Sequence, residues 1–214
     1  MNKLSSLLVL GIGAVMAFTS CDNKKQSGPI EFIDPVSEFN PRAKFITVYG
    51  ICEHRTKGDT LQVLTDNGDT ISYNVTKARE DEQIFGGYAP GDRMAVIIDG
   101  TDGPVVEVVN ESALLGNWLT PNPIDGSSEV GISIKDGGIA ESIEQTSIIY
   151  KTWRLNRGQL EILLVREGGG DEEETNIYSI LKLDADSLIL SDEEDTFDYR
   201  REGATAAATT ENLE

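Results

Sequence analysis

The fold is decided by the sequence Ile148-Ile149-Tyr150-Lys151-Thr152-Trp153-Arg154-Leu155, which is followed by Asn156-Arg157-Gly158 and then by Gln159-Leu160-Glu161-Ile162-Leu163-Leu164-Val165-Arg166. Two runs of bulky and β-branched residues flank a short turn that contains glycine, which is the pattern of a β-hairpin. Because side chains alternate across a strand, we expect Leu160, Ile162 and Leu164 to share one face, and Tyr150 and Trp153 to lie on opposite faces. The two aromatic rings would then not form one platform.

Runs of the same kind fill the second half of the chain. Trp118 begins the first of them, and further strands are predicted at 130–134, 138–143, 175–183, 187–191 and 196–200. In the run 175–183 we expect Ile177, Leu181 and Leu183 to face the interior. Together with the hairpin, these about seven or eight strands predict an up-and-down barrel or a strongly curled meander.

The first half has similar strands separated by turn residues, at 43–52, 60–65, 70–75, 93–98 and 104–109. The turn Asp66-Asn67-Gly68-Asp69 is a strong hairpin signal, because Asn-Gly readily adopts positive φ. About five strands is the count of a small Greek-key barrel such as an OB-fold. The wholly apolar run from Met94 to Ile98 predicts one strand that is buried on both faces. The predicted fold class is therefore all-β, with two small antiparallel barrels.

The N-terminus has the features of a secretory signal. Met1-Asn2-Lys3 carries a positive charge, Leu4 to Phe18 is almost entirely apolar or small, and Thr19-Ser20-Cys21 follows. The cysteine and the polar residues after it resemble the lipobox of bacterial lipoproteins. This resemblance implies cleavage before Cys21, acylation of Cys21 by groups such as palmitate, and a lipid anchor in the cell envelope, which we expect to be in the outer membrane. The alternative is an uncleaved transmembrane anchor, but a run of about 15 residues is shorter than the ~20 that a membrane helix needs.

These features predict a division of the chain into five parts. Residues 1–20 are the signal peptide and 21–41 a lipid-anchored flexible tether. Residues 42–111 form the OB-like barrel and 112–201 the second barrel, and 202–214 form a disordered tail that is low in bulky residues.

Composition excludes several classes of function. The net charge is −19, which repels phosphate backbones, so we expect no nucleic-acid partner. Apart from Cys21 the one cysteine is Cys52, so no internal disulfide is expected, and His54 is the single histidine. Few residues remain for a zinc site or a nucleophile–histidine pair. We expect no metal, no cofactor and no enzymatic activity.

Residues 112–201 resemble the compact lipocalin-like domains of bacterial envelope lipoproteins. The resemblance rests on Leu115-Gly116-Asn117-Trp118, which matches the G-x-W opening of lipocalins, on Asp136-Gly137-Gly138-Ile139-Ala140, on the central hairpin, and on Asp186-Ser187-Leu188-Ile189-Leu190 and Tyr199-Arg200-Arg201. It implies that an arginine of the last strand, Arg200 or Arg201, packs over Trp118. We assign the closure of the barrel to Gly116, Trp118 and Arg200. The interior of such a barrel holds one small ligand or is filled by side chains.

Two other groups of residues are candidates for chemistry. Cys52 and His54 alternate with Glu53 and would share a strand face, as a nucleophile and its base could, but we favour Cys52 as a small buried residue. The acidic runs 171–174 and 192–195 lack the spacing of a calcium loop and are interpreted as solvated loops. We therefore expect a non-catalytic binding role for a small apolar ligand or a partner protein. The alternative is an accessory subunit of an envelope complex with solid barrel interiors.

Overall fold

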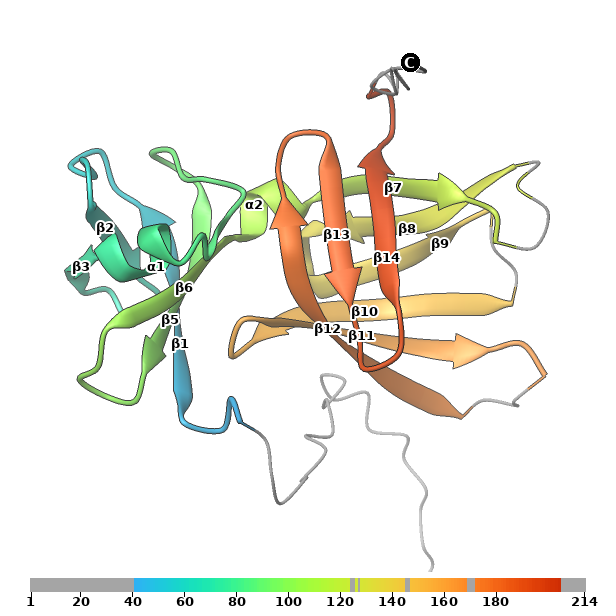
Figure 1. Cartoon of the computed structure of the whole chain (residues 1–214), viewed down its shortest axis with the longest axis horizontal. Coiled ribbons are helices and arrows are strands. Elements are labelled where there is room, and N and C mark those ends of the chain that lie inside the picture. Colours follow the sequence, from blue (N-terminus) through green and yellow to red (C-terminus); the bar gives the residue numbers. More distant parts are fainter. Residues whose placement is uncertain (1–40, 124–125, 127, 145–146, 169–171, 205–214) are drawn as a thin grey trace, which may run out of the picture. The chain divides into compact units, whose positions relative to one another are not determined.

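The computed structural model describes residues 41–204 except 124–125, 127, 145–146 and 169–171 (Figure 1). The predicted signal peptide with Cys21, nearly all of the predicted tether and the tail from residue 205 lie outside the described residues. Within the described part, strands predominate, and none of its helices is long and apolar enough to span a membrane.

The first half forms a six-stranded sheet. Its strands are β1 (Phe45–Cys52), β2 (Thr60–Thr65), β3 (Thr70–Asn74), β4 (Ile84–Phe85), β5 (Arg93–Asp99) and β6 (Val105–Asn110), with the short helix α1 (Thr76–Glu80) between β3 and β4. Their order in the sheet is β3-β2-β1-β5-β6-β4. Three consecutive strands and a later strand that returns beside β1 make a Greek key, as the sequence predicts.

This sheet differs from the predicted antiparallel barrel in two respects. The pairing of β4 with β6 is parallel, so the sheet is mixed. In addition, the pairings of the described strands end at β3 and β4 and do not form a ring. The physical reason is that β4 lies beside β6, in the position that β3 would need to close the sheet into a barrel.

Strand β5 is buried on both faces, as the run Met94–Ile98 predicts. Met94 and Val96 pack in a core with Cys52, Leu61 and Val63, which belongs to the sheet alone. Ala95 and Ile97 point the other way and pack in a larger core that also contains the apolar side chains of the barrel. All four of these β5 side chains are fully buried. The sheet and the barrel thus share a core and belong to one compact unit.

The second half is a closed eight-stranded barrel, which confirms the predicted up-and-down barrel. Strands β7 (Gly116–Pro121), β8 (Glu129–Lys135), β9 (Ile139–Ile143), β10 (Ile148–Asn156), β11 (Gln159–Arg166), β12 (Glu173–Leu183), β13 (Ser187–Ser191) and β14 (Thr196–Arg201) pair in chain order, and the 3₁₀ turn η1 (Asp136–Gly138) joins β8 to β9. The barrel closes where β14 pairs with β7.

Two β-bulges change which side chains face the barrel interior. The register of β10 against β11 shifts between Tyr150 and Thr152, so both Tyr150 and Trp153 are buried in the core instead of lying on opposite faces. A second shift, between Ile180 and Lys182 of β12, leaves Leu181 exposed. The prediction for β12 was therefore wrong for two of its three residues, because the interior positions are Tyr178, Ile180 and Leu183. The prediction for Leu160, Ile162 and Leu164 is confirmed.

The connection between the sheet and the barrel is fixed by hydrogen bonds. Asn110 caps the short helix α2 (Glu111–Leu114) by accepting from the Ala113 N–H at 3.1 Å, and its amide donates to Asp92 at 2.8 Å. Nearby, the Tyr49 hydroxyl donates to the Leu155 carbonyl at 2.5 Å, which joins β1 to β10. The predicted boundary at residues 111 and 112 falls in α2, and as a division into separate folding units it stays a prediction.

Candidate functional site

One end of the barrel is closed by Gly116, Trp118 and Arg201. The Arg201 guanidinium lies 4.1 Å from the centre of the Trp118 ring, and Trp118 is fully buried. The same guanidinium donates to the carbonyls of Leu115 at 2.8 Å and Ala113 at 2.7 Å. Gly116 has a φ of 137°, and a Cβ there would lie 2.3 Å from the Arg201 Nη1. A glycine is required at this position because the arginine occupies the space of a side chain.

The arginine over the tryptophan is Arg201 and not Arg200, which corrects the assignment made from sequence. Arg201 pairs directly with Trp118 across the β14–β7 junction and shares the inward direction of Tyr199. Arg200 points the other way, where it forms an ion pair with Glu129 and donates to the Ala204 carbonyl.

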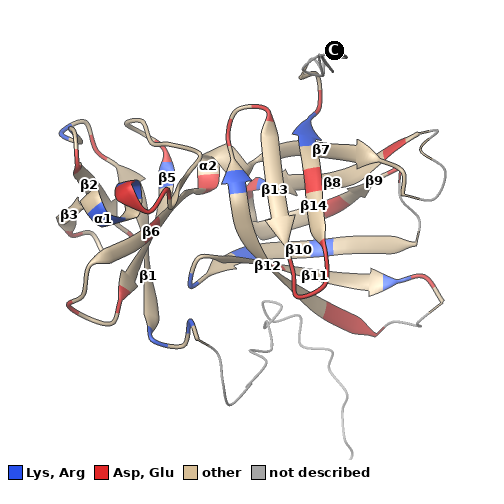
Figure 2. Cartoon of the chain, viewed as in Figure 1, with Lys and Arg blue, Asp and Glu red and all other residues tan. Residues whose placement is uncertain are grey.

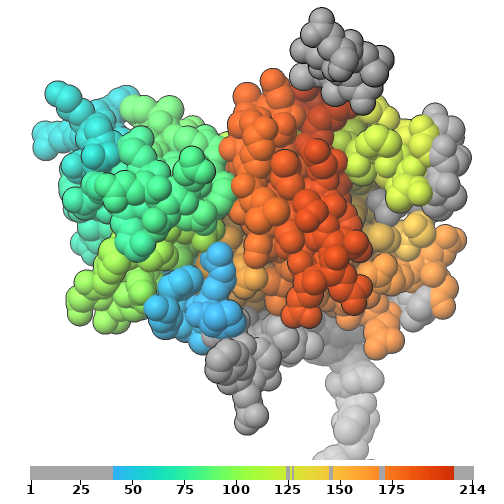
Figure 3. Space-filling model, viewed as in Figure 1, coloured from blue at the N-terminus to red at the C-terminus, as the bar shows by residue number. Residues whose placement is uncertain are grey.

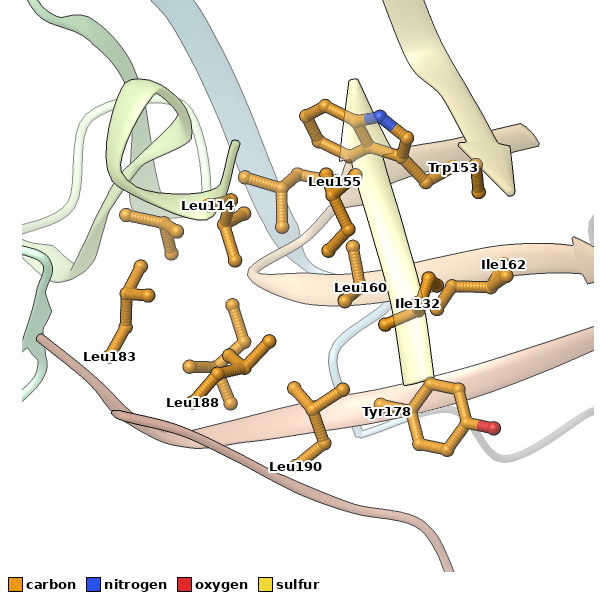
Figure 4. Packing of buried hydrophobic residues seen from close by; sticks show 14 of the residues in the cluster. Leu114, Ile132, Trp153, Leu155, Leu160, Ile162, Tyr178, Leu183, Leu188 and Leu190 are labelled. Carbon is orange, nitrogen blue, oxygen red and sulfur yellow. The ribbon is translucent and has the colours of Figure 1, made fainter. Parts of the chain in front are cut away.

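The barrel interior next to this closure is packed with apolar side chains. Figure 4 shows side chains from α2, β8 and β10–β13 converging on one space. Most of them are almost wholly inaccessible: Leu114, Ile132, Leu155, Leu160, Ile162, Leu188 and Leu190. The space-filling view shows a continuous surface over β13 and β14 on the face in view (Figure 3). This part of the barrel is a solid core.

Three tyrosines form a polar group inside the barrel. Tyr150 and Tyr199 are neighbours there, and Tyr178 accepts from the Asn176 amide at 2.9 Å while its ring meets Phe197 edge-on. Burial is the main cause that raises the pKa of Tyr150 to about 12, and the neighbouring Tyr178 adds to the shift. Burial and the two other hydroxyls raise the pKa of Tyr199 as well. These hydroxyls stay neutral at physiological pH and serve as hydrogen-bonding groups in an apolar surrounding.

A groove with a volume of about 540 Å³ lies between the sheet and the barrel. Residues of β1, β5, α2, the η1 turn and β10 line it, together with Leu115, which directly follows α2. Its apolar lining consists of Tyr49, Leu115, Trp153 and Leu155, and its polar lining includes Arg93, Glu111, Ser112, Asp136 and Arg154. The volume lies within the range of small-molecule sites, roughly 300–1,000 Å³, which combine apolar walls with a few polar groups.

The aromatic wall of the groove is held rigidly. The Trp153 indole N–H donates to the Lys135 carbonyl at 2.8 Å, and the Tyr49 hydroxyl donates to Leu155 as described above. Gly138 lets the η1 turn approach this wall, since a Cβ there would meet the Trp153 carbonyl at 3.1 Å. Both rings are therefore fixed before any ligand arrives, which lowers the entropic cost of binding.

The charged rim of the groove centres on Arg93. Its guanidinium donates to both carboxylate oxygens of Asp66 at 2.7 Å and contacts Glu111 at 2.9 Å. Burial raises the pKa of Glu111, an effect that Arg93 opposes and that the negative charges of Asp66 and Asp136 reinforce. A ligand that brings a hydrogen-bond donor to Glu111 would relieve this burial cost.

The residues that the sequence suggests for catalysis do not come together. Strand β1 ends at Cys52, so the expected alternation stops there. His54 lies exposed in the following turn, and the proposed sharing of one strand face is wrong. Cys52 is buried, and its Sγ lies 3.4 Å from the Thr56 hydroxyl. The interpretation of Cys52 as a small core residue is confirmed.

The acidic run 192–195 is a turn. Asp192 accepts from the backbone N–H groups of Glu194 and Asp195 at 3.0 and 2.8 Å, which lowers its pKa. No group of three or more metal-ligating side chains occurs among the described residues.

The groove was not predicted from the sequence. Its residues come from five separate segments, and none of them belongs to a motif that carries binding chemistry. One feature of the sequence could have pointed to the groove. It is the short glycine-containing turn Asp136-Gly137-Gly138, which lies beside the strand of Trp153 in the fold.

A comparison with known protein families agrees with the architecture of the barrel. Residues 110–202 match the family model described as lipocalin-like. Among solved structures, a lipocalin-like protein from Bacteroides thetaiotaomicron VPI-5482 is 27% identical, with 41% of this chain and 95% of that chain covered and a TM-score of 0.38. No curated protein matches the chain. The family match covers all eight barrel strands, including Gly116, Trp118 and Arg201. Residues 110–202 therefore form a lipocalin-like domain.

Proposed function

We propose that this protein is a lipid-anchored, non-catalytic binding protein of the cell envelope, and that its ligand is a small, largely apolar molecule held in the groove between the sheet and the barrel. Lipocalin-like folds commonly bind small hydrophobic ligands and are generally not enzymes. The observation that carries the proposal is the groove of about 540 Å³, whose wall contains two fixed aromatic rings.

The packing of the barrel favours the groove over the interior as the ligand site. Leu160, Leu164 and Leu188 are fully buried by their neighbours, so a ligand beside them would have to displace core side chains. In the groove, a ligand would cover the half-exposed Tyr49 ring and the half-exposed Leu115 side chain while its polar end meets Glu111.

The proposed location rests on the N-terminal sequence. The apolar run before Cys21 and the polar residues after it support export, acylation of Cys21 with fatty acids such as palmitate, and retention in the outer membrane. Metabolic labelling with a palmitate analogue tests this part. Label is expected on the wild-type protein and absent from a Cys21→Ala variant, and an unlabelled wild type would overturn it.

Native mass spectrometry of the protein from its own envelope tests the binding function. We expect an extra mass that is lost on denaturation. Asp136→Trp, which places a large ring at the exposed rim of the groove, should abolish that mass, whereas Asp102→Trp in an exposed turn between β5 and β6 should retain it.

Two other outcomes separate the alternatives. If the extra mass survives Asp136→Trp but is lost in Tyr178→Phe, the ligand lies within the barrel and the groove is the wrong site. A bare protein mass in every sample would contradict ligand binding and favour an accessory subunit with solid interiors, which is the second function that the packed barrel core supports.

A further inference from the structure

Strand β3 is the free edge of the sheet. The barrel is closed, and at the opposite edge of the sheet β4 is covered, because the N–H of Gly86 directly after it donates to the Leu183 carbonyl of β12 at 2.9 Å. No strand pairs with the outer side of β3 among the described residues (Figure 1). An unpaired edge of this kind is a template for a further strand unless charges, proline or a bulge protect it.

The edge of β3 has none of these protections. Its sequence Thr70-Ile71-Ser72-Tyr73-Asn74 is free of charge and proline, and its register against β2 is regular. Figure 2 shows the same lack of charge along β2 and β3, although the chain carries a net charge of −19. Four of the five residues are exposed, and the side chain of Ile71 remains 40% accessible.

The hydrogen-bond register determines which main-chain groups are available. Thr65 donates to Asp69, and Val75 donates to Asp59, so the odd-numbered residues of this segment bond to β2. In an antiparallel pair the intervening residues direct their N–H and C=O groups away from the partner. The main-chain groups of Thr70, Ser72 and Asn74 therefore point outward along the free edge.

We propose that β3 pairs with β3 of a second copy of this chain, antiparallel and centred on Ser72. In this register Ser72 faces Ser72 of the second copy, and Thr70 faces Asn74 in both directions. Each of these three facing pairs exchanges two main-chain hydrogen bonds. A two-fold axis relates the copies, so the interface closes and does not extend into a fibre.

Side chains favour this register and this partner. On the face that contains Leu61 and Val63, Ile71 of each copy lies opposite Tyr73 of the other, in the closer type of antiparallel pair. Pairs of an aromatic and a β-branched residue are among the favourable cross-strand contacts.

The pairing is small for an interface. One five-residue strand per copy buries less than the about 1,200 Å² of a standard stable complex. We therefore expect weak association in dilute solution and strong association on a membrane, where lipid anchoring confines the copies and raises their effective concentration. This expectation about the membrane rests on the proposed anchor, whereas the pairing itself does not.

Cysteine crosslinking of the full-length chain tests the proposal, in membranes and in concentrated solution. Ser72→Cys places two thiols across the axis, within the ~7 Å between Cα atoms that a disulfide spans. Gln62→Cys, on the neighbouring strand and the same face, is the control, because its two copies would lie about 14 Å apart, at three strand spacings. We expect at least about tenfold more crosslinked dimer for Ser72→Cys. Background from Cys21 is the same in both variants, and Cys52 is buried.

A second variant tests the role of the main chain. Ser72→Pro removes an outward N–H and leaves the bonds to β2 in place, so it should abolish dimers while circular dichroism shows an unchanged fold. Equal crosslinking of Ser72→Cys and Gln62→Cys in both samples would overturn the proposal. Crosslinks to another protein would assign the edge to a different partner and also overturn it. Failure of the anchor would show separately, as protein missing from the membrane fraction.

Discussion

Replacing Arg201 with alanine is the most direct test of how the barrel closes. The change removes the cation over Trp118 and the donors to the carbonyls of Ala113 and Leu115. It also removes the bond from Nε to the Ala185 carbonyl at 2.5 Å, which lies at the exposed side of the group.

The size of the effect follows from these contacts. The two part-buried hydrogen bonds from a charged donor contribute about 1.5 kcal/mol each. The cation–π contact adds about 1 kcal/mol. The bond to Ala185 adds little, because water can replace the lost donor at an exposed site. Allowing for incomplete additivity, we expect a loss of about 3–5 kcal/mol in the free energy of unfolding.

The matched control is the neighbouring residue. Arg200→Ala breaks an exposed ion pair with Glu129, which contributes about 0–1 kcal/mol. Urea unfolding followed by circular dichroism and tryptophan fluorescence measures both variants. For a folded part of this size, the loss expected for Arg201→Ala corresponds to a fall of about 6–20 °C in the Tm of thermal unfolding. Equal losses for the two variants would refute the assignment of closure to Arg201.

Three further predictions concern other buried groups. Gly116→Ala should destabilise the protein by about 2–4 kcal/mol in thermal unfolding, because the new Cβ meets Arg201 at a φ that alanine disfavours; an unchanged Tm would contradict this. Burial raises the pKa of Glu107, although Arg42 opposes the shift. At a pH above this raised pKa the buried carboxylate is ionised, and its ionised form lowers the free energy of unfolding. Glu107→Gln should therefore raise Tm at about pH 7, and the gain should disappear as the pH falls towards about 4; a gain independent of pH would argue against it. The pKa of Tyr150 is raised to about 12, so its neutral form stabilises the fold up to the unfolded-state pKa of about 10, and this contribution is lost as the pH rises through about 12. We expect the ultraviolet absorbance of the wild type, compared with that of the Tyr150→Phe variant, to show that Tyr150 ionises as the protein unfolds. Ionisation of Tyr150 near pH 10 in the folded protein would disprove the burial argument.

Strand positions and fold class follow from local sequence. Alternating runs and glycine-containing turns indicate all eight barrel strands, because both signals depend only on neighbouring residues. The inward direction of Leu160, Ile162 and Leu164 follows in the same way. The number of strands in the first half suggests a Greek key, and the observed strand order agrees with it. The lack of closure depends on β4, a two-residue strand that is too short to leave a pattern.

Bulges are the features that local patterns do not indicate. The bulges in β10 and β12 reverse the direction of every later side chain in the strand, and a bulge depends on the partner strand. Local alternation therefore predicts opposite faces for Tyr150 and Trp153 and an inward direction for Leu181, and the bulges overturn both. The choice between Arg200 and Arg201 is a similar problem of register. Here Phe197 and Tyr199, which are both inward-facing, could have identified Arg201 by alternation.

The groove is a property of tertiary structure. Tyr49 and Trp153 are 104 residues apart in the chain, and what brings them together is the docking of the β10–β11 hairpin on the sheet. Arg42 contributes to that docking by donating both to Glu107 and to the Arg157 carbonyl at 2.7 Å. No spacing in the sequence encodes such a contact.

The double burial of β5 has a consequence for folding. Since Met94 and Val96 belong to one core while Ala95 and Ile97 belong to the other, neither half can melt without exposing apolar surface of the other. The two halves should unfold in a single cooperative transition, and either half made alone would tend to aggregate through this strand. A chain built in this way behaves as one indivisible piece, although its two halves look like separate modules.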